Sequence, residues 1–197
     1  MKPGGRQAYQ QLMRDAQACR LCEGHLKDGV RPVFQVLPQA RILIAGQAPG
    51  RRVHESGVPF DDASGDRLRD WMGVSREVFY DAQKVAVLPM SFCFPGSGRS
   101  GDLAPRRECA PAWRQPLLDG LEGLRLTLLV GSYAQRWHLP KPHTSLTETV
   151  RNWRSGGAGL LPLPHPSPRN NVWLARHPWF AADVLPVLRA RVRSALS

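Results

Sequence analysis

The four cysteines of the chain have the spacing of a metal or cluster site. Cys19 and Cys22 form a C-x-x-C pair, and Cys93 and Cys109 follow much later. Thiolates bind zinc and iron–sulfur clusters, and a close pair with two distant partners is typical of such sites. The alternative is four buried free thiols, which are common in protein cores. The spacing, with no cysteine left over, favours a metal or cluster site.

A second group of reactive side chains follows an apolar run, in the segment "LPHPSPRN". His165 can donate a proton or a hydrogen bond near neutral pH, and prolines on both sides stiffen its loop. Ser167 and Arg169 supply a hydroxyl and a guanidinium that suit a nucleic-acid phosphate. The alternatives are a histidine bonded to the backbone and a serine that caps a helix.

A third candidate is the loop in residues 42–60, "ILIAGQAPGRRVHESGVPF". An apolar run enters a turn rich in Gly and Pro, and the segment ends on Phe60. Loops that follow a strand in this way often hold phosphate. This one lacks the lysine of a P-loop and the Gly spacing of a dinucleotide fingerprint.

The composition indicates one globular domain over residues 1–197 and a polyanionic partner. The chain is 42% hydrophobic, with a net charge of +11 and a sequence pI of about 10.5. It has 23 Arg and 4 Lys. Codon bias explains Arg in place of Lys but not the excess of basic residues, so we expect nucleic-acid binding. With no apolar run of ~18–20 residues and no signal-peptide core, we expect a cytoplasmic protein without membrane contact.

Hydrophobic periodicity and capping residues predict alternating strands and helices. Strands are expected at 41–46, 84–91 (ended or bent by Pro89), 125–131 and 159–164. Helices are expected at 5–18, after a Ser64 cap as far as Gly73, at 106–123, at 132–139, from a Ser145–Glu148 capping box through Trp153, and at 178–194 with a kink at Pro186.

This alternation predicts a three-layer α/β/α sandwich around a central four-stranded, largely parallel sheet. In such folds the ligand site lies beyond the carboxyl ends of the strands. Three unusual loops leave those ends: "GQAPG", "PMSFCFPG" and "PHPSPRN". We therefore expect them to meet in one site.

Taken together, these motifs resemble the uracil-DNA glycosylase superfamily. "GQAPGRRVHESGVPF" is similar to the "GEAPG…G-x-PF" block of its iron–sulfur, thermophile-type branch, and "ASGDRLRDWMG" to that branch's "AG-x-LL" helix. "HPSPRN" is close to the superfamily's "HPSP" loop. The order of the four cysteines follows the branch's cluster-ligand pattern. The resemblance extends from about Cys19 through "HPSPRN", which is most of the chain.

The resemblance implies roles for the residues in these loops. Phe60 would stack on a base flipped out of DNA, and His165 would donate a hydrogen bond to O2 of the departing base. The turn of Gly46, Gln47, Ala48 and Pro49 would lie beneath that base, and the backbone N–H groups of Gln47 and Ala48 would assist His165 in catalysis. Pro166, Ser167 and Pro168 would pinch the DNA backbone, and Arg169 or the residues after it would fill the space that the base leaves. Cys19, Cys22, Cys93 and Cys109 would hold a [4Fe-4S] cluster, with zinc or no metal as alternatives.

The chain also departs from the family pattern at the positions that carry catalytic charge. Gln47 replaces the Glu of the first block, and Ala48 stands where the best-known branch has a water-activating Asp. Val53 and His54 replace a Glu-Asp pair. Pro89 falls near the place of the Asn that reads uracil. Candidate replacements for the missing base are Glu55, Asp61 and Asp62.

Three hypotheses follow for the function. The first is a monomeric DNA repair glycosylase that hydrolyses the N-glycosidic bond of uracil or another deaminated base in damaged DNA. The second is a superfamily member that binds lesions without cutting, motivated by the lost carboxylates. The third is an iron–sulfur protein that senses redox state.

Overall fold

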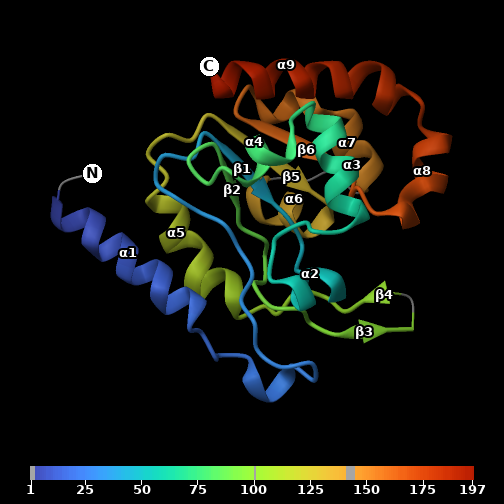
Figure 1. The fold of residues 1–197 in the computed structure, drawn as a ribbon. Coiled ribbons are helices and arrows are strands. Elements are labelled where there is room, and N and C mark those ends of the chain that lie inside the picture. The colour runs from blue at the N-terminus through green and yellow to red at the C-terminus, as the bar shows by residue number, and fades with distance from the viewer. Residues whose placement is uncertain (1–2, 100, 141–144) are drawn as a thin grey trace.

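A four-stranded sheet forms the centre of the molecule (Figure 1). The computed structural model describes residues 3–99, 101–140 and 145–197. Strands β1 (Ile42–Ala45), β2 (Val85–Val87), β5 (Leu126–Val130) and β6 (Leu160–Leu163) run in the order β2-β1-β5-β6. Every pairing among them is parallel. The predicted sheet is thus confirmed, and all its carboxyl ends lie at one edge.

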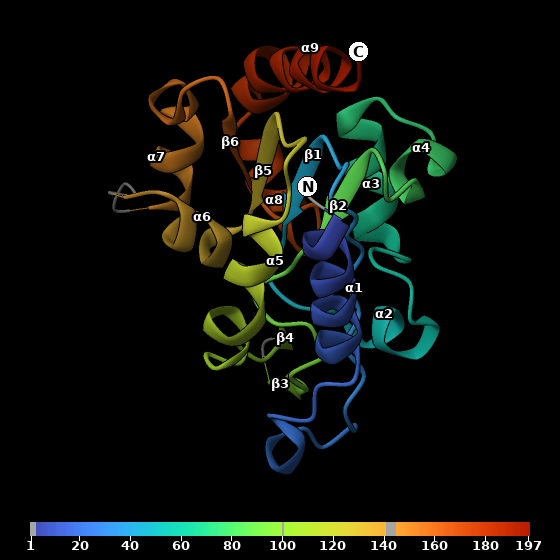
Figure 2. The same ribbon diagram turned by 90° about the vertical axis from the view of Figure 1, so that its left-hand side faces the viewer.

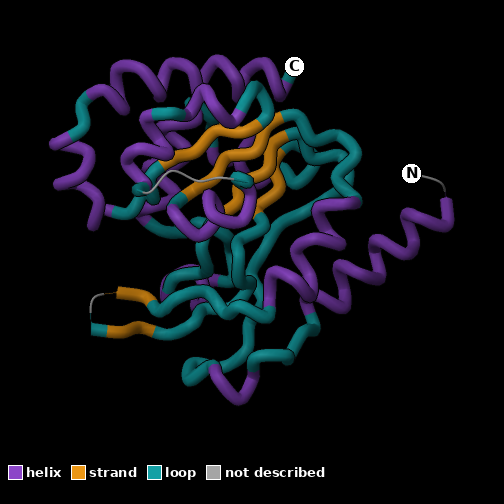
Figure 3. The backbone as a smooth tube through the Cα atoms, turned by 180° about the vertical axis from the view of Figure 1, so that it is seen from behind, coloured by secondary structure: helices purple, strands orange, loops and turns teal. Residues whose placement is uncertain are grey.

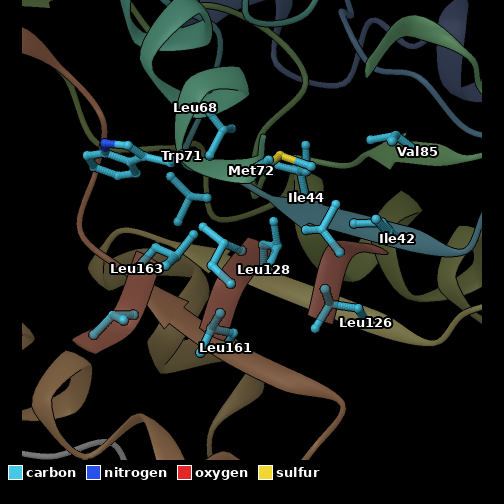
Figure 4. Close-up of a cluster of buried hydrophobic side chains, with 14 of the residues drawn as sticks. Ile42, Ile44, Leu68, Trp71, Met72, Val85, Leu126, Leu128, Leu161 and Leu163 are labelled. Carbon is cyan, nitrogen blue, oxygen red and sulfur yellow. The ribbon is translucent and has the colours of Figure 1, made fainter. Parts of the chain in front are cut away.

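Helices α3 (Ala63–Met72), α4 (Arg76–Tyr80), α7 (Leu146–Arg151) and α9 (Leu185–Leu196) contribute to the core on one face of the sheet. Figure 4 shows Leu68, Trp71 and Met72 of α3 in one cluster with the strand residues Ile42, Ile44, Val85, Leu126, Leu128, Leu161 and Leu163. These side chains are 0–5% exposed, so water is excluded from this layer.

The opposite face of the sheet carries α1 (Pro3–Gln17), α5 (Gln115–Asp119) and α6 (Ser132–His138). Helices α1 and α5 lie side by side (Figure 2), and the Tyr9 hydroxyl donates to the Leu117 carbonyl at 2.9 Å. Leu43 faces this layer while Ile42 and Ile44 face the other, as strand alternation requires. Helices on both faces confirm the three-layer prediction.

Two helix boundaries test the predicted caps. Asp62, not Ser64, caps α3: its carboxylate accepts from the Gly65 N–H at 2.9 Å, while Ser64 lies inside the first turn. The prediction was wrong because both residues are good caps and only the backbone selects between them. The other expectations are confirmed, since Gly73 ends α3 with φ +66° and Ser145 accepts from the Glu148 N–H.

Prolines interrupt three predicted elements. Strand β2 ends at Val87, before Pro89, rather than reaching residue 91. Instead of a helix over 106–123, a π-helical turn at Ala110–Arg114 leads into α5. The C-terminal helix likewise begins as a π turn at Phe180–Val184, and Pro186 lies in the first turn of α9. Each proline removes a backbone donor, so the regular hydrogen-bond pattern stops or shifts beside it.

Several short elements lie in segments expected to be loops. Helix α2 (Arg51–Ser56) and an antiparallel hairpin of β3 (Ser97–Gly98) and β4 (Gly101–Asp102) lie together at the lower right of Figure 1. Figure 3 shows this hairpin apart from the central sheet. Three-ten turns at Glu23–His25, Trp153–Gly156 and Pro168–Asn170, and α8 (Asn171–Arg176), complete the described elements. Helix α7 therefore stops at Arg151, before Trp153. None of the described helices is long and apolar enough to cross a bilayer.

Candidate active site

A cavity of about 550 Å³ opens at the carboxyl edge of the sheet. The loops after β1, β2 and β6 all reach it, as the sequence predicts, and the β3–β4 hairpin adds a further wall. Among the residues singled out from the sequence, the cavity is lined by Gly46, Gln47, Ala48, Pro49, Val53, Phe60, Asp62, Ser64, Pro89, His165, Ser167 and Arg169. A volume of this size is typical of ligand pockets.

The loop after β1 is held by backbone hydrogen bonds. The Met90 N–H donates to Gly46 O at 3.0 Å, and the Ser91 N–H donates to Gln47 O at 3.2 Å. The loop after β2 therefore supports the loop after β1 without using its side chains. Within the described chain, the N–H groups of Gln47 and Ala48 donate to no protein acceptor. They remain available to a ligand in the cavity.

Phe60 is held in an unusual backbone conformation beside this loop. Its φ is +56°, the one positive value at a non-glycine position in the described chain. A Cβ at Gly65 would overlap the Phe60 carbonyl oxygen, and a Cβ at Gly46 would lie 3.6 Å from the ring. The ring packs edge-on against Phe79, with centroids 6.1 Å apart. Such strain persists where the surroundings enforce it, often at binding sites.

Side-chain bonds lock the loop that carries His165. The Ser167 N–H donates to His165 Nδ1 at 3.2 Å, and Asn170 Nδ2 donates to His165 O at 2.7 Å. The Arg169 N–H in turn donates to Ser167 Oγ at 3.2 Å. From α3, Arg67 Nη1 donates to Ser167 O at 3.2 Å, which joins the two motif segments.

These bonds define the chemical state of His165. Because Nδ1 accepts a hydrogen bond, the proton of the neutral ring lies on Nε2. Burial lowers the pKa of His165 below its usual range, and the negative charges of Asp62 and Asp102 offset part of that shift. The ring therefore stays neutral at pH 7 and offers one N–H as a donor.

Two carboxylates share the cavity with His165. Asp62 Oδ1 is engaged by the Gly65 N–H. A Cβ at Gly50 would lie 4.0 Å from Asp62 Oδ2 and 3.5 Å from Asp102 Oδ2, so both oxygens approach the same glycine. The other two candidate bases from the sequence, Glu55 and Asp61, do not line the cavity, and Asp61 pairs with Arg76 at 3.0 Å.

Sequence reasoning missed Asp102. It lies in β4, and Ser97 Oγ donates to its Oδ1 at 3.4 Å. The available signal was an acidic residue in a Gly-rich loop of a strongly basic chain, just after the second strand. That signal is weak because the hairpin, which brings Asp102 to the cavity, has no distinctive hydrophobic pattern.

Basic side chains also reach the cavity. Arg51 and Arg52 at the start of α2 line it, and Arg169 lines it from the histidine loop. Of the two loop prolines expected to grip DNA, Pro166 is buried and Pro168 exposed, and neither lines the cavity. They instead flank the residues that do.

The four cysteines converge in a second, smaller cavity. Cys19, Cys22, Cys93 and Cys109 all line it, together with apolar side chains that include Leu26 and Phe92. None of these cysteines is in a disulfide. Among the described residues, no three His, Cys, Asp or Glu side chains are spaced to hold a metal ion as they stand. Burial raises the pKa of Cys93 to about 11 and that of Cys109 to about 12.

Each of these sulfurs has a hydrogen-bond donor beside it. Trp113 Nε1 donates to Cys19 Sγ at 3.0 Å, and the Phe92 N–H donates to Cys109 Sγ at 3.3 Å. The Arg31 backbone and the Arg106 side chain approach Cys93 and Cys22 in the same way. N–H donors to sulfur stabilise thiolates and tune iron–sulfur clusters.

A comparison with protein families agrees with this geometry. A family model described as the uracil DNA glycosylase superfamily matches residues 34–189. The match contains the two motif loops, Phe60, His165, Cys93 and Cys109, whereas Cys19 and Cys22 precede it. Members of this superfamily are generally DNA glycosylases. The parallel sheet, the loops that meet at its carboxyl edge and the family match together show that this chain belongs to the uracil DNA glycosylase superfamily.

Proposed function

We propose that this protein is a DNA repair glycosylase that removes uracil or another deaminated base flipped out of DNA. The observation that carries the proposal is the hydrogen bond from the Ser167 N–H to His165 Nδ1 at 3.2 Å. It leaves a neutral imidazole that lines the cavity, and its Nε2–H donates to no acceptor among the described residues. The net charge of +11 favours a polyanionic substrate.

His165 stabilises the departing base in this scheme. When the bond between C1′ and the base nitrogen breaks, its electron pair leaves with the base and spreads onto O2. A fixed N–H donor stabilises that charge as it develops. The unoccupied N–H groups of Gln47 and Ala48 lie in the same cavity and add to this stabilisation. Phe60, held by its neighbours, provides the face on which the base stacks.

Asp62 activates the water in this scheme. The water oxygen forms a bond with C1′ and its proton passes to the Asp62 carboxylate, which leaves an abasic sugar and a free base. Asp62 is favoured over Glu55 and Asp61 because it alone of the three lines the cavity. Its position is fixed by the Gly65 N–H, since Oδ1 caps α3, while Oδ2 accepts no hydrogen bond from the residues that the structure describes.

The loop after β2 affects which deaminated base the cavity accepts. Pro89 lines the cavity, and the family resemblance puts an Asn that reads uracil near this place. Proline has no side-chain hydrogen-bonding group, so base recognition rests on the remaining polar groups. We therefore expect this protein to tolerate more than one deaminated base.

An excision assay tests the function. Single- and double-stranded oligonucleotides carrying uracil, hypoxanthine or xanthine are incubated with excess folded protein, and abasic sites are cleaved with alkali. We expect product from at least one substrate, and none from His165→Ala. Tight, salt-sensitive binding without product would instead identify a lesion-binding protein.

We also propose that the four cysteines hold a [4Fe-4S] cluster. The support is the number of thiols, their convergence in one apolar cavity and the N–H donors beside their sulfurs. The alternative occupant is a zinc ion. With tetrahedral coordination and a Zn–S distance of ~2.3 Å, zinc would require the four sulfurs to lie ~3.8 Å from one another. When bound, the cluster would join the segment of Cys19 and Cys22 to the loops of Cys93 and Cys109.

Metal analysis of anaerobically purified protein tests the cluster. We expect a brown protein with about four irons per chain and charge-transfer absorption in the visible. Cys109→Ser should lose both the colour and the iron. A colourless protein with one zinc, or with no metal after reconstitution with iron and sulfide, would contradict the proposal.

A further inference from the structure

The largest fully buried side chain in the described part of the chain is a charged one. It belongs to Arg114, the last residue of the π-helical turn before α5, and it is 0% exposed. Its Nε donates to Leu88 O at 3.1 Å, just past the end of β2. Its Nη1 and Nη2 are also buried, and neither has an acceptor. Four N–H donors of one guanidinium are therefore left without a partner.

Another buried arginine of the same chain shows what is missing at Arg114. Arg69 is 7% exposed, and its nitrogens have three acceptors. They are the Asp66 carboxylate at 2.6 Å, the Tyr80 hydroxyl at 3.3 Å and Phe60 O at 3.4 Å. Among the residues with described positions, no carboxylate offsets the charge of Arg114 in this way. A buried charge without compensation is strongly destabilising, so Arg114 needs a negative partner.

A second unpaired polar atom lies on α6, on the same face of the sheet. His138 is the last residue of that helix, and its Nε2 is buried without a hydrogen-bond partner. Burial, together with the positive charge of Arg114, lowers the pKa of His138 to about 3. The ring is therefore neutral at pH 7, and it can carry its one proton on Nε2. The same electrostatic influence shows that the two side chains are neighbours.

The chemistry of these two groups selects a small anion. An anion supplies the negative charge that Arg114 lacks, and it accepts hydrogen bonds from the guanidinium and from Nε2–H of His138. A water molecule would accept the same bonds but leave the charge uncompensated. A direct bond from Arg114 to His138 Nε2 is not formed in the structure. Because the site is closed to solvent, a monoatomic ion suits it better than a phosphate or an organic acid.

We propose that Arg114 and His138 bind a halide ion such as chloride between the π-helical turn and α6. The ion compensates the buried charge of Arg114, whose Nε in turn holds Leu88 O. Leu88 precedes Pro89, which lines the active-site cavity, so the ion supports that wall from behind. Neither Arg114 nor His138 lines the cavity itself. The inference is therefore independent of the proposed glycosylase activity.

Thermal unfolding in chloride tests the site. Chloride replaces gluconate, an organic anion too large to enter, at constant ionic strength and pH. An ion that binds only the folded state stabilises it, so the wild-type Tm should rise by about 5 °C between millimolar and 0.5 M-range chloride. Arg114→Met should lose this rise. In gluconate it should unfold at or above the wild-type Tm, because an apolar side chain removes the cost of the unpaired charge.

Two further variants separate this site from general effects of charge. Arg193→Met is the matched control, since it removes the same charge from an exposed position of α9 and should keep the wild-type response to chloride. His138→Leu removes one donor and keeps the charge of Arg114, so the chloride concentration for half of the rise in Tm should increase several-fold. Bromide locates the ion directly. Crystals of the wild-type protein soaked in bromide should show an anomalous peak beside Arg114 Nη1 or Nη2 and His138 Nε2.

Each result supports or overturns the halide site. A wild-type Tm that does not respond to chloride would overturn it, as would an equal response in Arg114→Met, because the anions would then act elsewhere on the protein. Bromide crystals with a water, or with a direct bond between Arg114 and His138, in place of the peak would overturn it too. If Arg114→Met does not fold, the weaker chloride response of His138→Leu and the bromide peak decide. No DNA is present in these experiments, so their outcome leaves the glycosylase proposal untouched.

Discussion

Two loops at the same edge of the sheet hold their shape in different ways. The loop after β1 is supported through its backbone, by N–H groups of Met90 and Ser91. The loop after β6 is locked by its own side chains, because His165 and Asn170 both take part in its internal bonds.

The difference bears on how freely each loop can change its side chains. A side chain can change on a backbone-held loop without changing the loop's course, and this loop carries the uncharged residues Gln47 and Ala48. On a loop locked by side chains, the same change would remove both the chemistry and the scaffold. The negative charge at the site comes instead from Asp62 and Asp102, on other elements.

Replacement of His165 should have the largest effect. His165→Ala removes the donor to the base and the acceptor for the Ser167 N–H, and we expect excision to fall about 10³-fold. His165→Asn sharpens the comparison, because its side-chain oxygen can still accept from Ser167 while no atom reaches the place of Nε2. If His165→Asn kept wild-type single-turnover rates, the histidine would be a scaffold residue only.

Asp62→Asn should have the next largest effect. The amide oxygen can still cap α3 at the Gly65 N–H, so thermal stability should change little, while the negative charge is lost. We expect the single-turnover rate to fall about 10²-fold. Asp61→Asn is the control: this neighbouring carboxylate pairs with Arg76 outside the cavity and should leave the rate within a few-fold. An unchanged rate for Asp62→Asn would show that a group other than Asp62 activates the water.

Asn170→Ala tests the side-chain lock directly. It removes the 2.7 Å bond to His165 O, which should cost about 1 kcal/mol of stability and about tenfold in rate as the ring loses its orientation. Asn171→Ala is the matched control, since Asn171 is exposed and makes no side-chain hydrogen bond within the described chain. Denaturant titration and single-turnover assays provide the two readouts. Equal stability and equal rates for the two variants would show that backbone hydrogen bonds alone hold the loop after β6.

The sequence predicts the parallel sheet well because buried strands and helices carry strong hydrophobic patterns. Ile42, Leu43 and Ile44 are fully buried although consecutive strand residues face opposite sides of the sheet. Such a run therefore predicts helices on both faces. The same argument places the loops after β1, β2 and β6 together, since parallel strands end at one edge.

Other features depend on contacts that the sequence does not encode locally. The N-cap of α3 is Asp62 and not the predicted Ser64. Both residue types can cap a helix, so the backbone conformation after Phe60 selects between them. The β3–β4 hairpin was missed because its strands have two residues each and no apolar alternation. Asp102 enters the site only through that hairpin, so it could not be identified before it.

Gln47→Glu should have a small effect, and for an informative reason. It restores a carboxylate to the loop after β1, whose shape depends on the backbone bonds from Met90 and Ser91. If Asp62 already activates water, the rate should change by no more than about threefold and the fold should be unaltered. A rise of 100-fold in the excision assay would instead show that the wild-type site lacks an effective base.

The smallest effect concerns the pH profile of an Asp102→Asn variant. Burial lowers the pKa of His165, so wild-type excision should hold at neutral pH and fall only in acid, below the usual histidine value of ~6.5, where the ring gains a proton. The charge of Asp102 raises that pKa, so its removal should move the acid limb of kcat/KM to lower pH while the neutral rate stays nearly constant. The shift should also appear in NMR titration of the His165 ring without substrate, which separates electrostatics from chemistry. If the acid limb of kcat/KM did not shift, the charge of Asp102 would have no effect on His165 in solution. The hydrogen bonds within the loop after β6 would then determine the protonation state of His165 without the hairpin.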